Sequence, residues 1–258
     1  MTASAIRREE IVRLAITAGA ANVAELATYF QVTASTIRRD LAALNAQGRL
    51  ARTYGGALSL VAQSETSLQD RLIEAHQEKR AIARWAAAQV QPGESLLLDA
   101  GSTVGAFARQ LRFGQDLRVT TTGLTALHEL ADAPGVQVVC LGGRFRRLSQ
   151  SFLGPLTESA LERMTFDRVF LGADAVTPGK GICEAEPEQT RLKELMAQRT
   201  EKAYVLAHGV KLGTAPFHAW ARLPLPWTLV TDSTASDENL SAFVAEGVTV
   251  VVADGISI

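Results

Sequence analysis

The chain has 258 residues, of which 47% are hydrophobic, and a formal net charge of −1 at pH 7. This length and composition can fill one small domain and one of ordinary size. They exclude a membrane protein, because no uninterrupted apolar stretch is long enough to cross a bilayer and no apolar amino-terminal segment is present. We therefore expect a cytoplasmic protein without membrane contact.

Three short helices are predicted near the amino end. The first runs over about 6–18, and a second begins at Asn22, where Glu25 three residues on provides a reciprocal N-cap. A two-residue turn then leads to a third helix over 33–48, which Gly48 ends. Two helices joined by so tight a turn are typical of a helix-turn-helix unit.

The third helix has two different sides. Ile37, Leu41 and Leu44 fall at i, i+4 and i+7 and share an apolar face. The residues expected to reach base edges and phosphates from the helix start and its opposite face are Ser35, Thr36, Arg38 and Arg39. An arginine pair on a helix is usually just solvated, but here the caps and the tight turn coincide with it, which favours a recognition helix.

The segment after the third helix predicts a basic wing. Residues 49–57 alternate basic and neutral side chains before a glycine pair, as a small β-ribbon does, and Arg52 and Tyr54 are expected to contact the DNA backbone or minor groove. Residues 1–60 hold seven Arg against four Asp and Glu, a net charge of +3, so the remainder carries −4. Attraction for phosphate is thus concentrated at one end, and residues 1–58 are expected to form a winged helix-turn-helix domain.

The rest of the chain predicts an α/β domain. A polar segment over 59–70 is expected to link the two domains, and 71–90 is long enough for a helix. Apolar strand-like runs then recur near 96–98, 117–120, 136–141, 168–171, 203–207, 228–231 and 248–252. Helix-like segments separate many of them, at 104–112, 124–132, 156–163, 188–199 and 238–245. This alternation predicts, within 71–258, a largely parallel sheet covered on both faces.

Loops that follow these strands are the expected ligand site, because open α/β sheets bind ligands at the carboxyl ends of their strands. Residues 99–103 offer a close backbone approach at Gly101, two hydroxyls and the amides of a helix start, which suit an anion. Residues 120–123 and 141–143 add further hydroxyls and amides. Each loop alone is a weak signal, since glycine after a strand usually serves only a turn.

Both regions resemble the DeoR family of bacterial transcriptional regulators. The motifs that carry the resemblance are Arg8-Glu9-Glu10-Ile11, residues 36–41, Tyr54-Gly55-Gly56-Ala57, residues 99–103, Gly142-Gly143, residues 170–174 and Lys211-Leu212-Gly213. The resemblance extends from about 7 to 254. It implies a sensor domain related in fold to ribose-5-phosphate isomerases, in which a phosphorylated sugar or similar metabolite binds and alters operator affinity.

The resemblance, together with the loops, defines an expected effector site. Its residues are Asp99, Gly101, Ser102, Thr103, Thr121, Thr122, Gly142, Gly143, Arg146, Asp174, Glu186, Lys193 and Lys211. Ser102 and Thr103 would hold a phosphate with nearby amides, and Thr121 and Thr122 would line the same pocket. Arg146 or Lys211 would neutralise charge, and Asp99 and Asp174 would accept sugar hydroxyls. For Glu186 and Lys193, a solvated helical pair is an equally good interpretation.

The chain also departs from the family pattern. It reads Ala207-His208-Gly209-Val210 where family members commonly show an aspartate and serines, and Thr122-Gly123 replaces asparagine and serine. Glu184 stands where small hydroxyl residues are common. The identity of the effector therefore cannot be transferred from a relative.

The expected function is a repressor of a carbohydrate-catabolism operon, with operator DNA and a small phosphorylated metabolite as partners. A homo-oligomer is expected, because one helix-turn-helix covers only part of a useful site. No cofactor or metal site is expected, since the histidines show no paired ligand spacing. Two alternatives are an enzyme and an oligomerisation platform that binds no effector. The enzyme is disfavoured because Leu171 stands where the isomerases carry an additional aspartate.

Overall fold

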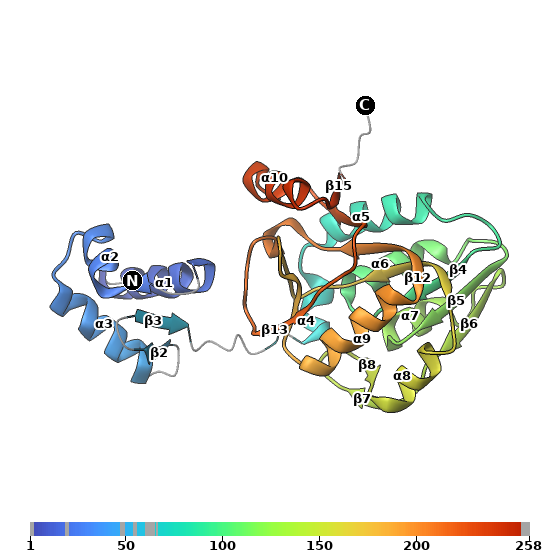
Figure 1. Ribbon diagram of the computed structural model, residues 1–258, viewed down its shortest axis with the longest axis horizontal. Coiled ribbons are helices and arrows are strands. Elements are labelled where there is room, and N and C mark those ends of the chain that lie inside the picture. Colours follow the sequence, from blue (N-terminus) through green and yellow to red (C-terminus); the bar gives the residue numbers. More distant parts are fainter. Residues whose placement is uncertain are drawn as a thin grey trace. The chain divides into compact units, whose positions relative to one another are not determined.

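The computed structural model describes residues 3–18, 21–46, 50–53, 56–59, 65 and 67–253. The chain divides into two compact units, residues 1–65 with 214–217 and residues 66–213 with 218–258 (Figure 1). None of the helices in these described ranges is long and apolar enough to cross a membrane.

The smaller unit has a winged helix-turn-helix architecture. Its helices are α1 (Ala3–Ala18), α2 (Val23–Tyr29) and α3 (Ala34–Ala46), which correspond to the three predicted helices. Its antiparallel sheet has the order β1-β3-β2, with β1 (Ala21–Asn22), β2 (Leu50–Thr53) and β3 (Gly56–Ser59). The predicted helix stop at Gly48 lies outside the described residues.

The apolar stripe of α3 is confirmed. Ile37 and Leu44 are fully buried and Leu41 is nearly so, and they pack with Ile11 and Leu26 in one small core. The turn before α3 contains Gln31 with a φ of 53°. Thr33 caps the helix, because the backbone N–H of Thr36 donates to its Oγ1 at 3.3 Å. The core therefore holds α3 with its opposite side facing solvent.

One buried carboxylate ties α1 to α3. Asp40, only 3% exposed, accepts hydrogen bonds from Nε of Arg7 at 2.7 Å and from Nε of Arg8 at 2.9 Å. The spacing argument did not predict this contact, since it treated both arginines only as positive charge. Two basic residues of the first 60 are thus paired with an acid inside the unit.

The larger unit is built on a parallel sheet of seven strands in the order β15-β14-β12-β9-β4-β5-β6. The strands are β4 (Ser95–Leu98), β5 (Leu117–Thr121), β6 (Val136–Cys140), β9 (Phe166–Leu171), β12 (Thr200–Leu206), β14 (Trp227–Thr231) and β15 (Thr249–Val252). Each predicted strand-like run coincides with one of them, so the parallel sheet is confirmed.

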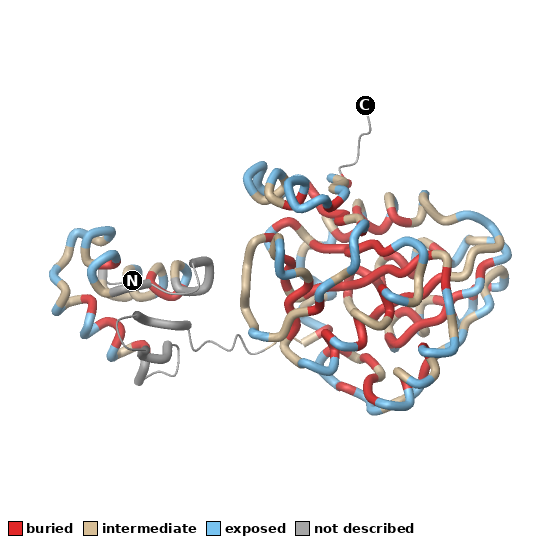
Figure 2. Tube along the Cα trace, in the orientation of Figure 1, coloured by how far each residue is buried: buried red, intermediate tan, exposed pale blue. Residues whose placement is uncertain are grey.

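Helices cover both faces of this sheet, as predicted. They are α5 (His76–Ala88), α6 (Ser102–Leu111) and α7 (Leu124–Leu130) on one face, and α8 (Pro155–Leu161), α9 (Pro187–Gln198) and α10 (Asp237–Ala245) on the other. Successive residues of β4 point to opposite cores: Leu96 and Leu98 pack with the first set and Leu97 with the second. The sheet is consequently buried through its centre (Figure 2).

The strand order places a switch point at β4. From β4 the chain adds β5 and β6 on one side, and then crosses to the other side, where β9 pairs with β4. Loops that leave β4 and β9 diverge at such a point and open a crevice between them. The segments 99–101 and 172–174 flank this crevice.

Local structure differs from the prediction in three places. Instead of one helix over 71–90 there are two, α4 (Leu68–Ile73) and α5, with Ala75 between them at a φ of 50°. Helix α4 begins inside the segment predicted to be a linker. Unpredicted elements are β7 (Arg144–Arg146), β8 (Ser151–Leu153), β10 (Ala175–Thr177), β11 (Gly181–Glu184), the 3₁₀ turn η1 (Gly209–Lys211) and β13 (Ala219–Ala221).

Replacing Asp40 with Asn should destabilise the smaller unit. Two partly buried guanidinium groups would lose their charged acceptor, at a cost of about 2–3 kcal/mol. Urea unfolding followed by far-UV circular dichroism on the full chain measures this, with Arg39→Ala on the exposed side of the same helix as the control. An unfolding transition that is unchanged in Asp40→Asn would show that the two ion pairs do not hold α1 against α3.

Candidate functional site

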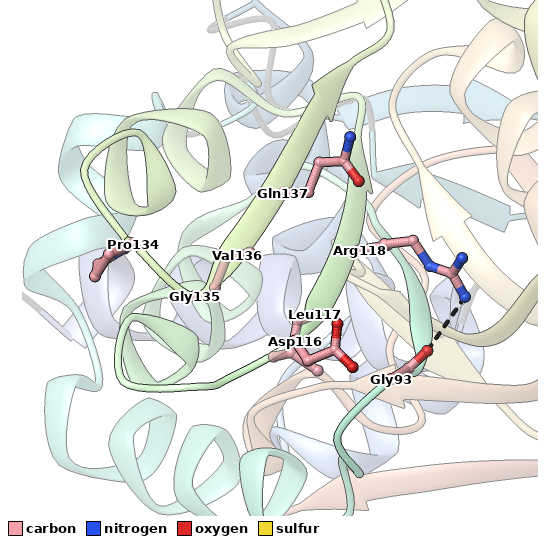
Figure 3. Close-up of a pocket in the computed structure, with 8 residues that line it drawn as sticks. All are labelled: Gly93, Asp116, Leu117, Arg118, Pro134, Gly135, Val136 and Gln137. Carbon is pink, nitrogen blue, oxygen red and sulfur yellow. Dashed lines mark hydrogen bonds between the residues drawn. The ribbon is translucent and has the colours of Figure 1, made fainter.

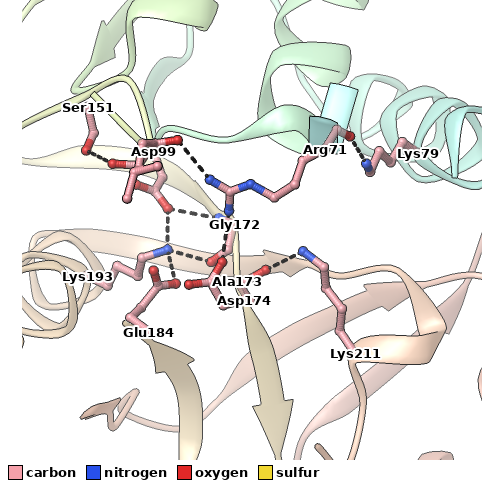
Figure 4. A network of polar contacts seen from close by, with 12 residues as sticks. Arg71, Lys79, Asp99, Ser151, Gly172, Ala173, Asp174, Glu184, Lys193 and Lys211 are labelled. Atoms are coloured by element: carbon pink, nitrogen blue, oxygen red, sulfur yellow. Dashed lines mark hydrogen bonds and ion pairs between the residues drawn. The ribbon is translucent and has the colours of Figure 1, made fainter. Parts of the chain in front are cut away.

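A small cavity of about 20 Å³ lies at the carboxyl ends of β4 and β9. It is lined by Arg71, Ala100, Gly101, Ser102, Thr103, Ser149, Gly172, Ala173, Asp174, Glu184, Gln189, Lys193 and Lys211. These residues come from α4, from the loops after β4 and β9, from β11 and α9, and from η1. Figure 4 shows the polar contacts among the charged members of this pocket, which we call the sensor pocket.

Lys193 of α9 is the centre of the sensor pocket. Its Nζ lies 2.7 Å from Oδ2 of Asp99, 2.7 Å from Oε1 of Glu184 and 2.7 Å from the carbonyl oxygen of Gly172, to which it donates (Figure 4). The backbone N–H of Gly172 also donates to Oδ2 of Asp99 at 3.0 Å. Burial alone would lower the pKa of Lys193, but the two carboxylates outweigh it and raise that pKa. Lys193 therefore stays charged at neutral pH.

Glu184 is a buried acid that holds its proton unusually tightly. Burial raises its pKa to about 8, helped by the negative charges of Asp174 and Asp99 and opposed by Lys193. The antiparallel register pairs Ala175 of β10 with Cys183 of β11, so the next residues along, Asp174 and Glu184, lie side by side. Glu184 can consequently donate as well as accept a hydrogen bond near neutral pH.

Two further cations surround Asp174. Nη1 of Arg71 in α4 donates to Oδ1 of Asp174 at 2.8 Å, and Nζ of Lys211 donates to the carbonyl of Ala173 at 2.7 Å. Burial lowers the pKa of Lys211, and Asp174 opposes that effect.

Lys79 of α5 donates to the carbonyl of Arg71 and, at 2.7 Å, to that of Glu74, so it caps the end of α4.

The start of α6 forms another wall of the sensor pocket. Gly101 is its N-cap and has a φ of 127°, a conformation that side-chain-bearing residues rarely adopt. Ser102 and Thr103 follow as the first helical residues, both buried and both lining the cavity. Unpaired amides at a helix start attract anions, and the two hydroxyls add donors. The fold thus brings an anion-compatible wall close to a cluster of buried carboxylates.

Several predicted effector residues meet in this pocket. The ones that line it are Gly101, Ser102, Thr103, Asp174, Lys193 and Lys211. Asp99 does not line the cavity itself, but its Oδ2 accepts a hydrogen bond from Nζ of Lys193. Lys193 is therefore a buried pocket cation and not a member of a solvated helical pair with Glu186, which is about half exposed at the start of α9.

The prediction was wrong about where Thr121 and Thr122 lie. Both are fully buried and neither lines the pocket. The hydroxyl of Thr121 donates to the carbonyl of Leu98 at 3.0 Å and accepts from the N–H of Gly123, so it stabilises the end of β5. A hydroxyl group that follows a parallel strand can thus form hydrogen bonds with backbone groups instead of with a ligand.

Gly142, Gly143, Arg146 and Glu186 also lie away from the pocket lining. Gly142 and Gly143 shape the entry to the β7–β8 hairpin, where a Cβ at Gly143 would meet Oγ1 of Thr157 and the carbonyl of Leu153. Arg146 is buried within that hairpin, 3.7 Å from Oε1 of Glu186. In this chain these residues therefore belong to the β7–β8 hairpin and its surroundings, not to the lining of the sensor pocket.

Other residues of the pocket were not predicted. Arg71 was assigned only to a predicted helix and was given no role in the site. Glu184 was noted only as a departure from the family pattern. Gln189 sits four residues before Lys193 and thus on the same side of α9. That spacing, given that Lys193 faces the pocket, is the signal that could have identified Gln189.

The predicted DNA-contacting side of α3 is accessible. Ser35, Arg38 and Arg39 are exposed, and Thr36 is half-buried with its hydroxyl 3.0 Å from Oγ1 of Thr33. Of the wing residues, the backbone of Arg52 pairs with Ala57, but its side chain lies outside the described residues, as does all of Tyr54. The candidate operator interface is therefore carried by the start and outer side of α3.

A second cavity lies at the opposite edge of the sheet, at the amino ends of β5 and β6 (Figure 3). It is lined by Gly93, Asp116, Leu117, Arg118, Pro134, Gly135, Val136 and Gln137. Arg118 uses its guanidinium to donate to the carbonyl of Gly93 at 3.2 Å. None of the predicted site residues lines this cavity. Among the described residues, no group of three or more His, Cys, Asp or Glu is placed to hold a metal ion.

A solved structure of ribose 5-phosphate isomerase A from Methanocaldococcus jannaschii is similar to part of the chain. The match has a TM-score of 0.39 and 18% identity, and it covers 53% of this chain and 54% of the isomerase.

Regulatory proteins match over nearly the whole length. Residues 7–63 match the DeoR-like helix-turn-helix domain and residues 74–233 match the DeoR C terminal sensor domain. The HTH-type transcriptional regulator GolR of Listeria innocua is 32% identical over 96% of this chain and 98% of its own length. The lactose phosphotransferase system repressor of Streptococcus mutans is 30% identical over 90% of this chain and 93% of its own length. With both of its units matched in this way, the chain belongs to the DeoR family of transcriptional regulators.

Proposed function

We propose that this regulator represses a carbohydrate-catabolism operon and that a phosphorylated sugar or related metabolite changes its operator affinity. The observation that carries the proposal is the sensor pocket, where a helix start suited to a phosphate lies near buried carboxylates suited to hydroxyls. The repressor from Streptococcus mutans, named for a lactose phosphotransferase system, supports the sugar assignment.

A sugar phosphate would use both walls of the sensor pocket. The phosphate accepts hydrogen bonds from the amides at the start of α6 and from Ser102 and Thr103, with Lys211 offsetting its charge. Hydroxyl groups donate to Asp174 on the facing wall. Asp99 acts indirectly, because it fixes Lys193.

The pocket favours binding over turnover. Lys193 is held at 2.7 Å by two carboxylates, which stabilises its charged form, so it is a poor base. Glu184 is engaged with that same ammonium. A sensor needs a rigid set of donors and acceptors, and this ion cluster supplies one.

Helix α4 follows the DNA-binding unit in the sequence and contributes a residue to the pocket. It begins at Leu68, close after the end of the smaller unit, and the N–H of Leu68 donates to the carbonyl of Leu148 at 3.0 Å. Its Arg71 reaches Asp174 in the pocket at 2.8 Å. An effector that binds Asp174 changes the partner of Arg71 and so biases α4 between two states. Relief of repression by ligand is the expected sign.

On the DNA side, Arg38 and Arg39 read one half-site from α3, and the wing contacts the backbone. One such unit covers too little sequence for a useful operator, so a homo-oligomer that reads repeated half-sites is expected.

Replacing Arg38 with Ala should weaken operator binding about five- to hundredfold, the range for losing one base-contacting arginine. Gel-shift titrations with the DNA upstream of the chain's own gene measure this at fixed salt, and effector affinity should not change. Arg84→Ala, an exposed arginine of the larger unit, is the matched control. Equal operator affinity in Arg38→Ala and wild type would contradict the assignment of α3.

Titrating phosphorylated sugars into the full chain should raise its melting temperature without converting them. Ser102→Ala should weaken this binding by about tenfold, because a charge-assisted hydrogen bond to phosphate contributes about 1.5 kcal/mol. Calorimetry measures the affinity, and chromatography of the recovered sugar detects turnover. Conversion would identify an enzyme, and the absence of any binding would identify an oligomerisation platform.

Replacing Arg71 with Ala should uncouple the two units. Operator binding without effector should stay within a few-fold of wild type. At effector concentrations that saturate the variant, effector should no longer change operator affinity by more than about twofold, against the five- to 150-fold usual for allosteric coupling. Gel shifts with and without effector measure the ratio. A variant that responds like wild type would exclude Arg71 of α4 from the coupling.

A further inference from the structure

Two buried oxygen atoms of the sensor pocket lack hydrogen-bond donors. Oδ2 of Asp174 and Oε1 of Gln189 are buried from solvent, and neither has a hydrogen-bond partner within the described part of the chain. Both residues line the pocket. Buried acceptors without partners are rare in folded proteins, because removing the acceptor from water costs free energy that no hydrogen bond within the protein offsets. These two atoms therefore indicate where a ligand would place hydrogen-bond donors.

Glu184 completes this wall, which we call the acceptor wall (Asp174, Glu184 and Gln189). The β10–β11 pairing sets Glu184 beside Asp174 (Figure 4). Gln189 lies in the first turn of α9, one helical turn before Lys193. The two carboxyl groups and one amide oxygen thus face the same small space. The acceptor wall therefore presents several hydrogen-bond acceptors to a ligand within a small area.

The positive charges near this wall are already used. Lys193 is held by Asp99 and Glu184, and Arg71 is bound to Oδ1 of Asp174 and to the carbonyl of Leu148. Lys211 donates to the carbonyl of Ala173 and is assigned to the phosphate, so a second negative group beside Asp174 would meet no further cation to offset its charge. The anion-compatible wall is elsewhere, at the start of α6.

We propose that the acceptor wall selects effectors whose end facing it carries neighbouring hydroxyl groups and no negative charge, and that it rejects a carboxylate at that position. This inference rests on the proposed sugar-phosphate function, and it names which end of the ligand meets which wall. The phosphate lies at the start of α6, and the hydroxyl-bearing end donates to Asp174 and Gln189.

The chemistry of the two ligand ends explains the selection. A hydroxyl can donate to Oδ2 of Asp174 or to Oε1 of Gln189, whereas a carboxylate has no proton to give and adds a charge beside Asp174. The donors that this wall could offer to a carboxylate are the proton of Glu184 and the amide N–H groups of Gln189, and neither of them offsets its charge.

Matched pairs of probes test the proposal. Five- and six-carbon polyol phosphates, each paired with the aldonic acid phosphate of the same configuration, differ only in a hydroxymethyl or a carboxylate at the far end. Calorimetry on the full chain at pH 7 should show at least tenfold tighter binding of the polyol member of the best pair.

Two variants assign the effect to the wall. Gln189→Met keeps the volume but removes the amide, so polyol binding should weaken about tenfold while binding of the acid barely changes. Asp174→Asn removes the negative charge and should narrow the ratio at least fivefold. Glu201→Gln, exposed near the amino end of β12, is the control and should leave both affinities unchanged. Melting curves verify that each variant is folded.

The outcomes separate the two proposals. If the acid binds as tightly as the polyol in wild type, or if Gln189→Met weakens both members equally, the acceptor-wall inference is overturned while the sugar-phosphate function stands. If no phosphorylated probe binds at all, the proposed function itself is overturned.

Discussion

The sensor pocket depends on one buried ammonium group. Lys193 joins the loop after β4 through Asp99, the loop after β9 through Gly172, and the end of β11 through Glu184. Such a charge is costly to remove from water, so it persists only because two carboxylates and a carbonyl replace the lost hydration. In return, segments that are distant in sequence keep a fixed geometry at the switch point of the sheet.

Most of the fold could be predicted because it is expressed in local patterns. The inner strands of the parallel sheet are buried on both faces and therefore read as apolar runs, and the helices between the strands carry their own periodicity. The break between α4 and α5 could not be predicted, because nothing in the sequence signals that Ala75 adopts a left-handed conformation. The short strands β7, β8, β10, β11 and β13 contain only three or four residues, too few to show a period.

The site was harder to predict than the fold, because a pocket is a property of pairing and register. Ser102 and Thr103 were accessible to prediction, since a strand, a glycine and a helix start follow each other in sequence. Thr121 follows the same pattern, yet its hydroxyl is consumed by the backbone. Glu184 meets Asp174 only through the β10–β11 register, which the sequence alone does not reveal. The family resemblance supplied both Lys193 and Asp99, but neither their ion pair nor the part of Glu184 in holding Lys193.

Asp40 has a consequence for how the smaller unit meets a polyanion. Arg7 and Arg8 give their Nε donors to this buried carboxylate, so two of the seven arginines counted in residues 1–60 are partly spent inside the fold. Counterion release on association follows the number of cations that actually touch phosphates, not the formal composition. Long-range attraction is correspondingly modest, and under the proposed function discrimination between sequences falls to the side chains on the outer side of α3. The two ion pairs therefore lower the non-specific attraction of this unit for DNA, and in exchange they fix the position of α3.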